Sequence, residues 1–225
     1  MKAMILAAGR GERMRPLTDR TPKPLLEAGG KPLIVWHIER LACAGFRELV
    51  INTAYLGERI EARLGNGSSW GVQIAYSRES EGALETGGGI HHALNLLGQE
   101  AFAAINSDIW TDYPFARLPK EPEGLAHIVL VDNPPHHPEG DFVLEAGRLR
   151  RRTQTPSLTP LTFSGVGVYR PELFAACAAG RFPLAPLLRA RFDQGLIAGE
   201  HYCGTWQDIG APERLAALDR SLRRG

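Results

Sequence analysis

The sequence predicts an α/β fold built on a doubly wound, mostly parallel, Rossmann-like sheet. Short apolar runs typical of buried strands recur up to Val131, and stretches with helical spacing lie between most of them. After Asp132 this pattern gives way to prolines, histidines and short alternating segments. We therefore expect a small mixed or antiparallel excursion in the C-terminal half of the chain.

The expected elements follow from these patterns in order. Five strands are expected from the apolar runs at residues 3–8, 49–52, 72–76, 102–105 and 125–131. A first helix begins near Pro32, whose fixed φ suits a first turn, and stops before Gly45. A second helix is expected at 57–64, and a third begins after Gly87-Gly88-Gly89 and runs to Leu97. Short antiparallel strands around 142–144 and 162–169 and closing helices at 183–192 and 212–222 complete the chain.

Length and composition exclude several classes of protein. The 225 residues are enough for one large α/β domain, and a formal net charge of +1 is unlike that of most nucleic-acid binders. The 3 cysteines are too scattered for a disulfide framework or a zinc site. The N-terminal apolar run is too short for a signal peptide or a membrane span. We expect a cytoplasmic monomer or small homo-oligomer with no nucleic-acid or membrane partner.

The segment after the first strand is the most informative part of the chain. It reads Leu6-Ala7-Ala8-Gly9-Arg10-Gly11-Glu12-Arg13-Met14-Arg15-Pro16-Leu17-Thr18, followed by Pro22-Lys23-Pro24-Leu25. Glycines at the carboxyl end of a parallel strand let backbone amides approach a phosphate closely, and the basic residues add positive charge. The dinucleotide fingerprint fails because Met14 stands at its third glycine, and no Walker-type lysine follows. For the glycines alone, a plain surface loop remains the alternative.

Two carboxylates stand where a metal ion would be useful. Asp108 follows the strand that ends at Ile105, on the same rim as the glycine loop, and Asp208 precedes a helix within Trp206-Gln-Asp208-Ile-Gly. Mg²⁺ needs hard oxygen ligands of this kind and keeps waters and phosphate oxygens in its other positions. Taken alone, Asp208 is better explained as a helix-start or capping residue, and Asp108 can equally be a turn former. The paired histidines at 91–92 and 136–137 are expected at the surface or in packing, because adjacent side chains rarely point together.

The string from Leu6 to Leu25, together with Gly30-Lys31-Pro32-Leu33, resembles the signature of the sugar nucleotidyltransferase family. The resemblance covers nearly the whole chain. It implies one nucleotidyltransferase domain at 1–225, with a nucleotide-binding half at about 1–132 and a sugar-binding half at about 133–225. No hexapeptide array follows, so no C-terminal β-helix is expected. The resemblance further implies that Arg13 and Lys23 are catalytic, contacting the triphosphate and the sugar phosphate, and that Asp108 and Asp208 hold Mg²⁺.

The same resemblance assigns the two substrate pockets. The segment from Glu79 through Gly89 is similar to the one that cups the base, although a flexible loop and a glycine-rich helix start are the alternative. The nucleotide-binding residues expected are Ala8, Gly9, Gly11, Glu12, Arg13, Lys23, Leu84, Thr86 and Gly87. The sugar-binding residues expected are Asn106, which otherwise closes a turn, and Gly140, Asp141 and Ser164. Ser107 replaces a usual glycine, and residues 150–156 replace a glutamate-lysine-proline element.

One variant within the base segment narrows the expected activity. The form Leu84-Glu-Thr-Gly-Gly-Gly89 is similar to that of the N-acetylmuramate-1-phosphate uridylyltransferases of peptidoglycan recycling. It implies transfer of UMP from UTP to N-acetylmuramate 1-phosphate by Mg-assisted displacement at the α-phosphorus, with release of pyrophosphate. Mannose-1-phosphate guanylyltransferase, glucose-1-phosphate thymidylyltransferase and a non-catalytic nucleotide-sensing module remain alternatives. A nicotinamide dehydrogenase is disfavoured by Met14 and by Asn52-Thr53, which end the second strand without an acidic residue.

Overall fold

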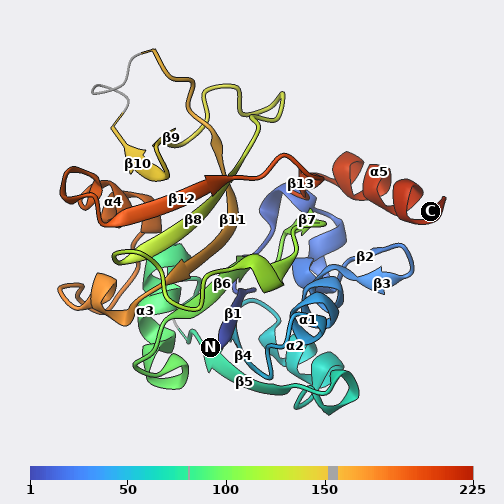
Figure 1. Ribbon diagram of the computed structural model, residues 1–225. Helices are drawn as coiled ribbons and strands as arrows, with labels where there is room; N and C mark the ends of the chain where they lie inside the picture. The colour runs from blue at the N-terminus through green and yellow to red at the C-terminus, as the bar shows by residue number, and fades with distance from the viewer. Residues whose placement is uncertain (81, 152–156, 225) are drawn as a thin grey trace.

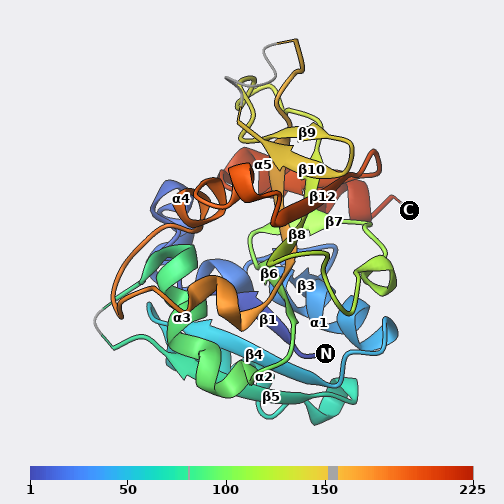
Figure 2. The same cartoon turned by 60° about the vertical axis from the view of Figure 1, so that its left-hand side comes forward.

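The computed structural model describes residues 1–80, 82–151 and 157–224, and within them nine strands form the main sheet. They are β1 (Ala3–Leu6), β4 (Glu48–Thr53), β5 (Gln73–Arg78), β6 (Phe102–Asn106), β8 (Ala126–Val131), β9 (Val143–Glu145), β10 (Arg148–Arg150), β11 (Thr162–Tyr169) and β12 (Ile197–His201). Their order is β5-β4-β1-β6-β11-β8-β12-β10-β9. Figures 1 and 2 show β5 at one end of the sheet and the β9–β10 hairpin at the other.

Helices cover both faces of the sheet. These helices are α1 (Leu33–Cys43), α2 (Gly57–Leu64), α3 (Glu85–Leu97) and α4 (Leu184–Arg189). Successive side chains of β1 point to opposite faces, so Ile5 packs with Ile38 of α1 and Ile60 of α2, whereas Met4 packs with Ile90 of α3. Burial on both faces explains why these strands read as continuous apolar runs.

The expected doubly wound, mostly parallel sheet with a mixed C-terminal part is confirmed, and the structure adds the strand order. β5, β4, β1 and β6 are parallel neighbours. β11 is antiparallel to both β6 and β8, so it separates β8 from the parallel strands that precede it in the chain. The register of β11 shifts between Phe163 and Val166, which forms an irregularity beside the end of β6.

The three consecutive glycines lie inside α3, so the expectation that this helix starts after them is wrong. α3 begins at Glu85, and each glycine lets another part of the chain approach the helix closely. A β-carbon at Gly87 would overlap the ring of Phe182, and one at Gly88 would overlap the carbonyl oxygen of Gly180. One at Gly89 would lie 2.8 Å from the Asn52 side-chain nitrogen. Glycine is therefore required here by packing.

A smaller layer joins the glycine loop to the end of the chain. Its elements are β2 (Glu27–Ala28), β3 (Lys31–Pro32), β7 (Ile109–Thr111), β13 (Trp206–Asp208) and α5 (Pro212–Leu222). Met14 is fully buried in a cluster with Leu33, Ile209 and Leu218, which anchors the loop. Figure 1 shows α5 at the side of the sheet near β2 and β13. No helix in the described ranges is both long and apolar enough to cross a bilayer.

Two features expected from the sequence differ or fall outside the described residues. The closing helix expected at 183–192 is shorter, because α4 ends at Arg189 and a single 3₁₀ turn, Phe192–Gln194, follows. Residues 152–156, which make up most of the segment that departs from the family pattern, lie outside the described residues, as does Glu81.

Candidate active site

The glycine loop forms a turn that packs against the Lys23 side chain. Gly11 has φ of 68°, and its carbonyl oxygen accepts a hydrogen bond of 2.9 Å from the buried Thr18 hydroxyl. A β-carbon at Gly11 would lie 3.1 Å from both Lys23 Cβ and Thr18 Cγ2. Short 3₁₀ turns at Glu12–Met14, Leu17–Asp19 and Lys23–Leu25 shape the rest of the loop. The turn therefore holds its backbone close to the lysine stem.

This loop forms one wall of a cavity of about 450 Å³ at the carboxyl edge of the parallel strands. The expected nucleotide-binding residues that line it are Ala8, Gly9, Gly11, Glu12, Arg13, Lys23 and Thr86. Leu84 and Gly87 are not among the lining residues. The Leu84 amide donates to Glu79 Oε2, and Gly87 is buried against Phe182. The structure thus gathers most of the expected nucleotide site around one cavity.

A second cavity of about 360 Å³ adjoins the first, and the two share Arg13, Asn106 and Asp108. Ser164 lines the second cavity from β11, and its hydroxyl donates to Val129 O at 2.7 Å. At Gly165, with φ of 81°, a β-carbon would lie 2.8 Å from Asn106 Nδ2, so the β11 irregularity packs directly on Asn106.

Gly140 and Asp141 lie apart from the other expected sugar-binding residues. They line a different cavity, of about 320 Å³. Asp141 Oδ2 accepts a 2.8 Å hydrogen bond from the Phe163 amide, and its Oδ1 lies 3.2 Å from His137 Nε2. Asp141 therefore supports the start of β11, and its role toward a sugar stays a prediction.

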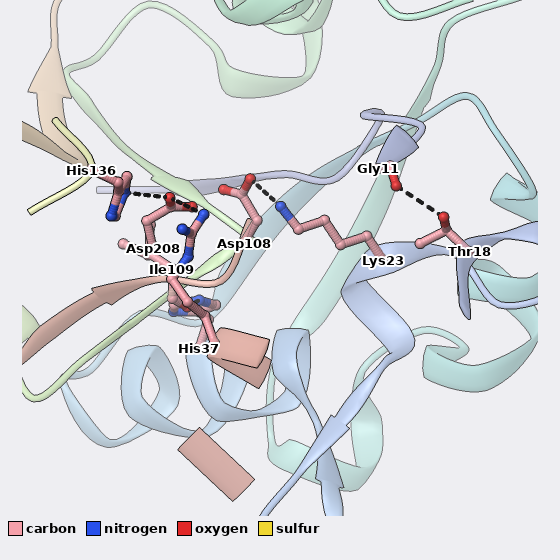
Figure 3. A network of polar contacts seen from close by, with 9 residues as sticks. Gly11, Thr18, Lys23, His37, Asp108, Ile109, His136 and Asp208 are labelled. Atoms are coloured by element: carbon pink, nitrogen blue, oxygen red, sulfur yellow. Dashed lines mark hydrogen bonds and ion pairs between the residues drawn. The ribbon is translucent and has the colours of Figure 1, made fainter. Parts of the chain in front are cut away.

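The two expected metal ligands come from segments that pair across the small β7–β13 sheet. Asp208 stands opposite Ile109, and the Ile209 amide donates to the Asp108 carbonyl oxygen at 2.8 Å. Lys23 Nζ lies 2.6 Å from Asp108 Oδ2, with only 9% of the lysine side chain exposed. Figure 3 shows Lys23 pointing to Asp108, with Asp208 on the far side of that carboxylate. Pairing thus brings both acids to the rim that Arg13 and Lys23 occupy.

Asp208 is held by two further side chains that the sequence did not assign to the site. Its Oδ2 accepts hydrogen bonds from Arg214 Nη2 at 2.9 Å and from His136 Nε2 at 3.0 Å. His136 approaches from the side opposite Asp108 in Figure 3 and lines the second cavity. The histidines at 136 and 137 do point to different partners. His136 lies at the surface, as expected, and its contact with Asp208 is an addition that the sequence did not predict.

Comparison with known proteins identifies the family to which this site belongs. Residues 2–154 match the family described as nucleotidyl transferase. The chain is also 53% identical over 221 residues to the N-acetylmuramate alpha-1-phosphate uridylyltransferase of Neisseria meningitidis serogroup B, over 96% of this chain and 95% of that protein. The chain belongs to the nucleotidyl transferase family.

Two other comparisons agree with this family. The N-acetylmuramate alpha-1-phosphate uridylyltransferase of Caulobacter vibrioides is 35% identical over 232 residues, covering 98% of this chain and 96% of that protein. The solved structure of a putative glucose-1-phosphate thymidylyltransferase from Bacillus anthracis superposes with a TM-score of 0.85 over 99% of this chain and 95% of that one. Because the two sequences are only 19% identical, this superposition shows a shared fold alone. The nucleotidyl transferase fold expected from the sequence is therefore confirmed.

The donor set of this nucleotidyl transferase suits a magnesium ion that arrives with phosphate. Among the described residues no group of three or more acidic, histidine or cysteine side chains is arranged to hold a metal. Mg²⁺ usually takes one or two protein carboxylates and completes its octahedron with waters and phosphate oxygens. Asp108 and Asp208 supply two hard oxygen donors with side chains 37% and 21% exposed. This partial exposure leaves them accessible to such an ion.

A buried histidine supports β7, the strand that follows Asp108. His37 of α1 donates from Nε2 to the Ile109 carbonyl oxygen at 2.9 Å. Because burial strips water from the imidazolium, the pKa of His37 falls to about 4, and the hydrogen bond to Ile109 only partly opposes this effect. A neutral His37 therefore fixes the position of β7 at physiological pH. The sequence showed this residue only as part of the apolar face of α1.

Two further buried polar residues, Asn52 and Glu79, also line the first cavity. The resemblance placed Glu79 in the segment expected to cup the base without naming it as a binding residue, and the sequence did not assign Asn52 to the site. A signal for Asn52 was present, since it lies next to the last residue of β4, opposite Leu6 at the end of β1. This is the kind of position that singled out Asp108.

Proposed function

We propose that this chain transfers UMP from UTP to N-acetylmuramate 1-phosphate and releases pyrophosphate. The identities of 53% and 35% to two N-acetylmuramate alpha-1-phosphate uridylyltransferases, each matched over nearly its whole length, support this choice of substrates. The main support for the proposed type of reaction comes from the structure. Two adjoining cavities meet at Arg13, Asn106 and Asp108, so two phosphorylated substrates bound side by side would bring their phosphates to the same cationic junction.

The residues of this junction have distinct tasks in the proposed reaction. The glycine turn at Gly9 and Gly11 presents backbone amides to the triphosphate. Lys23 holds the sugar phosphate near the α-phosphorus, and Arg13, which lines both cavities, neutralises the leaving pyrophosphate. A phosphate oxygen of the sugar 1-phosphate forms a bond to the α-phosphorus while the bond from that phosphorus to the pyrophosphate oxygen breaks. Positioning and charge neutralisation carry most of the catalysis in such transfers.

Asp108 and Asp208 would hold a magnesium ion in this reaction, in keeping with the donor set described above. When bound, the ion would supply positive charge to the phosphate oxygens of both substrates. Lys23 and Arg214, which pair with these carboxylates in the structure, orient the two acids.

The experiment that tests the function is pyrophosphate release from purified protein over a panel of substrates. UTP, GTP and dTTP are each combined with N-acetylmuramate, N-acetylglucosamine, mannose and glucose 1-phosphates in the presence of Mg²⁺. We expect UTP with N-acetylmuramate 1-phosphate to give the highest kcat/KM and no release without a sugar phosphate. Release restricted to GTP with mannose 1-phosphate, or to dTTP with glucose 1-phosphate, would assign one of the alternative activities. No release from any pair would favour a nucleotide-sensing module.

A further inference from the structure

A chain of buried hydrogen bonds connects the two walls of the nucleotide cavity. The Ala7 amide donates to Asn52 Oδ1 at 2.8 Å, and Asn52 Nδ2 donates to Glu79 Oε1 at 2.6 Å. The Leu84 amide donates to Glu79 Oε2 at 2.7 Å. Asn52 and Glu79 are 3% and 5% exposed, so water offers little competition for these bonds. The chain runs from the end of β1, across β4 and β5, to the start of α3.

The direction of every bond in this chain is dictated by its two ends. Both ends are backbone N–H groups, those of Ala7 and Leu84, and an N–H group can only donate. The side chains between them must therefore present an acceptor at each end. One amide and one carboxylate meet this requirement, because Asn52 accepts and then donates, while the Glu79 carboxylate accepts at both oxygens. Two amides in these positions would leave two donors facing each other.

The pair has little room to rearrange. Gly89 of α3 packs on it, since a β-carbon there would lie 2.8 Å from both Asn52 Nδ2 and Glu79 Oε1. The Glu79 backbone amide also donates to the Thr53 carbonyl oxygen at 2.8 Å. This bond holds the backbone at the end of β4 to the residue that follows β5. Gly89, the last of the three consecutive glycines, thus has a specific packing task.

We propose that Asn52 and Glu79 are positioning residues that set the separation between the phosphate-binding turn and the base-side segment. Ala7 lies two residues before Gly9, and Leu84 lies two residues before Thr86, and both Gly9 and Thr86 line the cavity. Movement at either end of this series of hydrogen bonds, at Ala7 or at Leu84, therefore moves a wall of the nucleotide site. The inference rests on the proposed function, in which this cavity receives UTP.

A charge-swap cycle tests the proposal. Glu79→Gln places two donors face to face, and Asn52→Asp places two carboxylates face to face. The double variant Asn52→Asp/Glu79→Gln restores every donor–acceptor pair, with the carboxylate moved to position 52. We expect each single change to raise KM for UTP about tenfold or more, the scale of one unsatisfied buried group. The double variant is expected to return to within about threefold of wild type. KM for the sugar phosphate should change less than KM for UTP.

Glu61→Gln is the matched control. It converts a carboxylate to an amide in the partner of Arg78, the residue just before Glu79, but Glu61 does not line the cavity. We expect its KM for UTP to match wild type. A wild-type KM for UTP in Glu79→Gln, or a double variant no better than the worse single variant, would overturn the proposal.

Calorimetric binding of UTP, without sugar phosphate, separates this inference from the proposed function. Wild-type protein that binds UTP but releases no pyrophosphate with any sugar phosphate would refute the function. Recovery of UTP affinity in the double variant would still support the positioning role. Loss of affinity in both single variants without recovery in the double variant would refute it, because simple damage to the fold predicts that outcome.

Discussion

Replacing Lys23 with methionine removes one nearly buried positive charge from the junction of the two cavities and keeps a side chain of similar length. Lys23 Nζ lies 2.6 Å from Asp108 Oδ2, and its aliphatic stem packs under Gly11. Methionine preserves most of that packing. The change therefore tests the charge rather than the volume of the side chain.

The expected effects on turnover and on stability differ in size. A fixed group that stabilises developing charge is typically worth about 10²–10³-fold in kcat, so we expect a loss of this order in Lys23→Met. Breaking a fully buried ion pair would cost about 3–5 kcal/mol of stability. The Asp108 side chain is 37% exposed and regains water once Lys23 is lost. We therefore expect the free energy of unfolding to fall by only about 1 kcal/mol.

Pyrophosphate release gives kcat and KM, and urea unfolding gives stability. Lys31→Met is the matched control, because Lys31 Nζ pairs with Glu39 Oε2 at 2.5 Å and lies over the Trp36 ring, outside the two cavities. It should lose a similar amount of stability and keep kcat within about twofold of wild type. If Lys23→Met kept more than about a tenth of the wild-type kcat, the proposed role of this charge would be refuted.

Two further predictions concern the acids and the buried histidine. Chelation of divalent metal should abolish pyrophosphate release, and added Mg²⁺ should restore it. Asp208→Asn should raise the Mg²⁺ concentration that gives half-maximal activity about tenfold or more. An unchanged Mg²⁺ requirement in this variant would contradict the assignment of Asp208 as a metal ligand. The pKa of His37 is about 4 in the folded chain against 6.5 as the ordinary value, so the unfolded state binds more protons between these pH values. The contribution of neutral His37 to the free energy of unfolding should thus be complete above pH 6.5 and should fall by about 3 kcal/mol on acidification to pH 4. Urea unfolding over this range should show a shallower pH dependence in His37→Gln but not in the exposed control His92→Gln, and equal slopes in wild type and His37→Gln would argue against the assignment.

Much of the fold and the centre of the site followed from local patterns. Buried parallel strands must be apolar on both faces, so the runs at β1, β4 and β6 were visible in the sequence. The helix at 57–64 was predicted with the bounds that α2 has in the structure. Arg13 and Lys23 were assigned from the resemblance of the loop to a family signature, and the structure places both of them on the wall of the first cavity. Asp108 drew attention because the carboxyl end of a parallel strand is a position where ligands bind, whereas its role as a metal ligand rests on the resemblance and stays a prediction.

Other features were hidden because they depend on contacts between distant segments. The placement of β11 between β6 and β8 sets the wall of the second cavity, and no local spacing encodes the order of strands in a sheet. The contact of His136 with Asp208 could not be predicted, because the two residues are distant in the sequence. Gly140 and Asp141 match a motif but face a different cavity.

By itself the sequence determined which residues are buried, where the phosphate-binding turn lies and which side chains carry charge at strand ends. These properties depend on periodicity and on the conformational range of single residues. Only the tertiary structure decided that Asn52 and Glu79 join the two walls of the nucleotide cavity, and that His136 and Arg214 hold Asp208. A hydrogen bond has a direction and needs its partner within about 3 Å, and that proximity is created by folding.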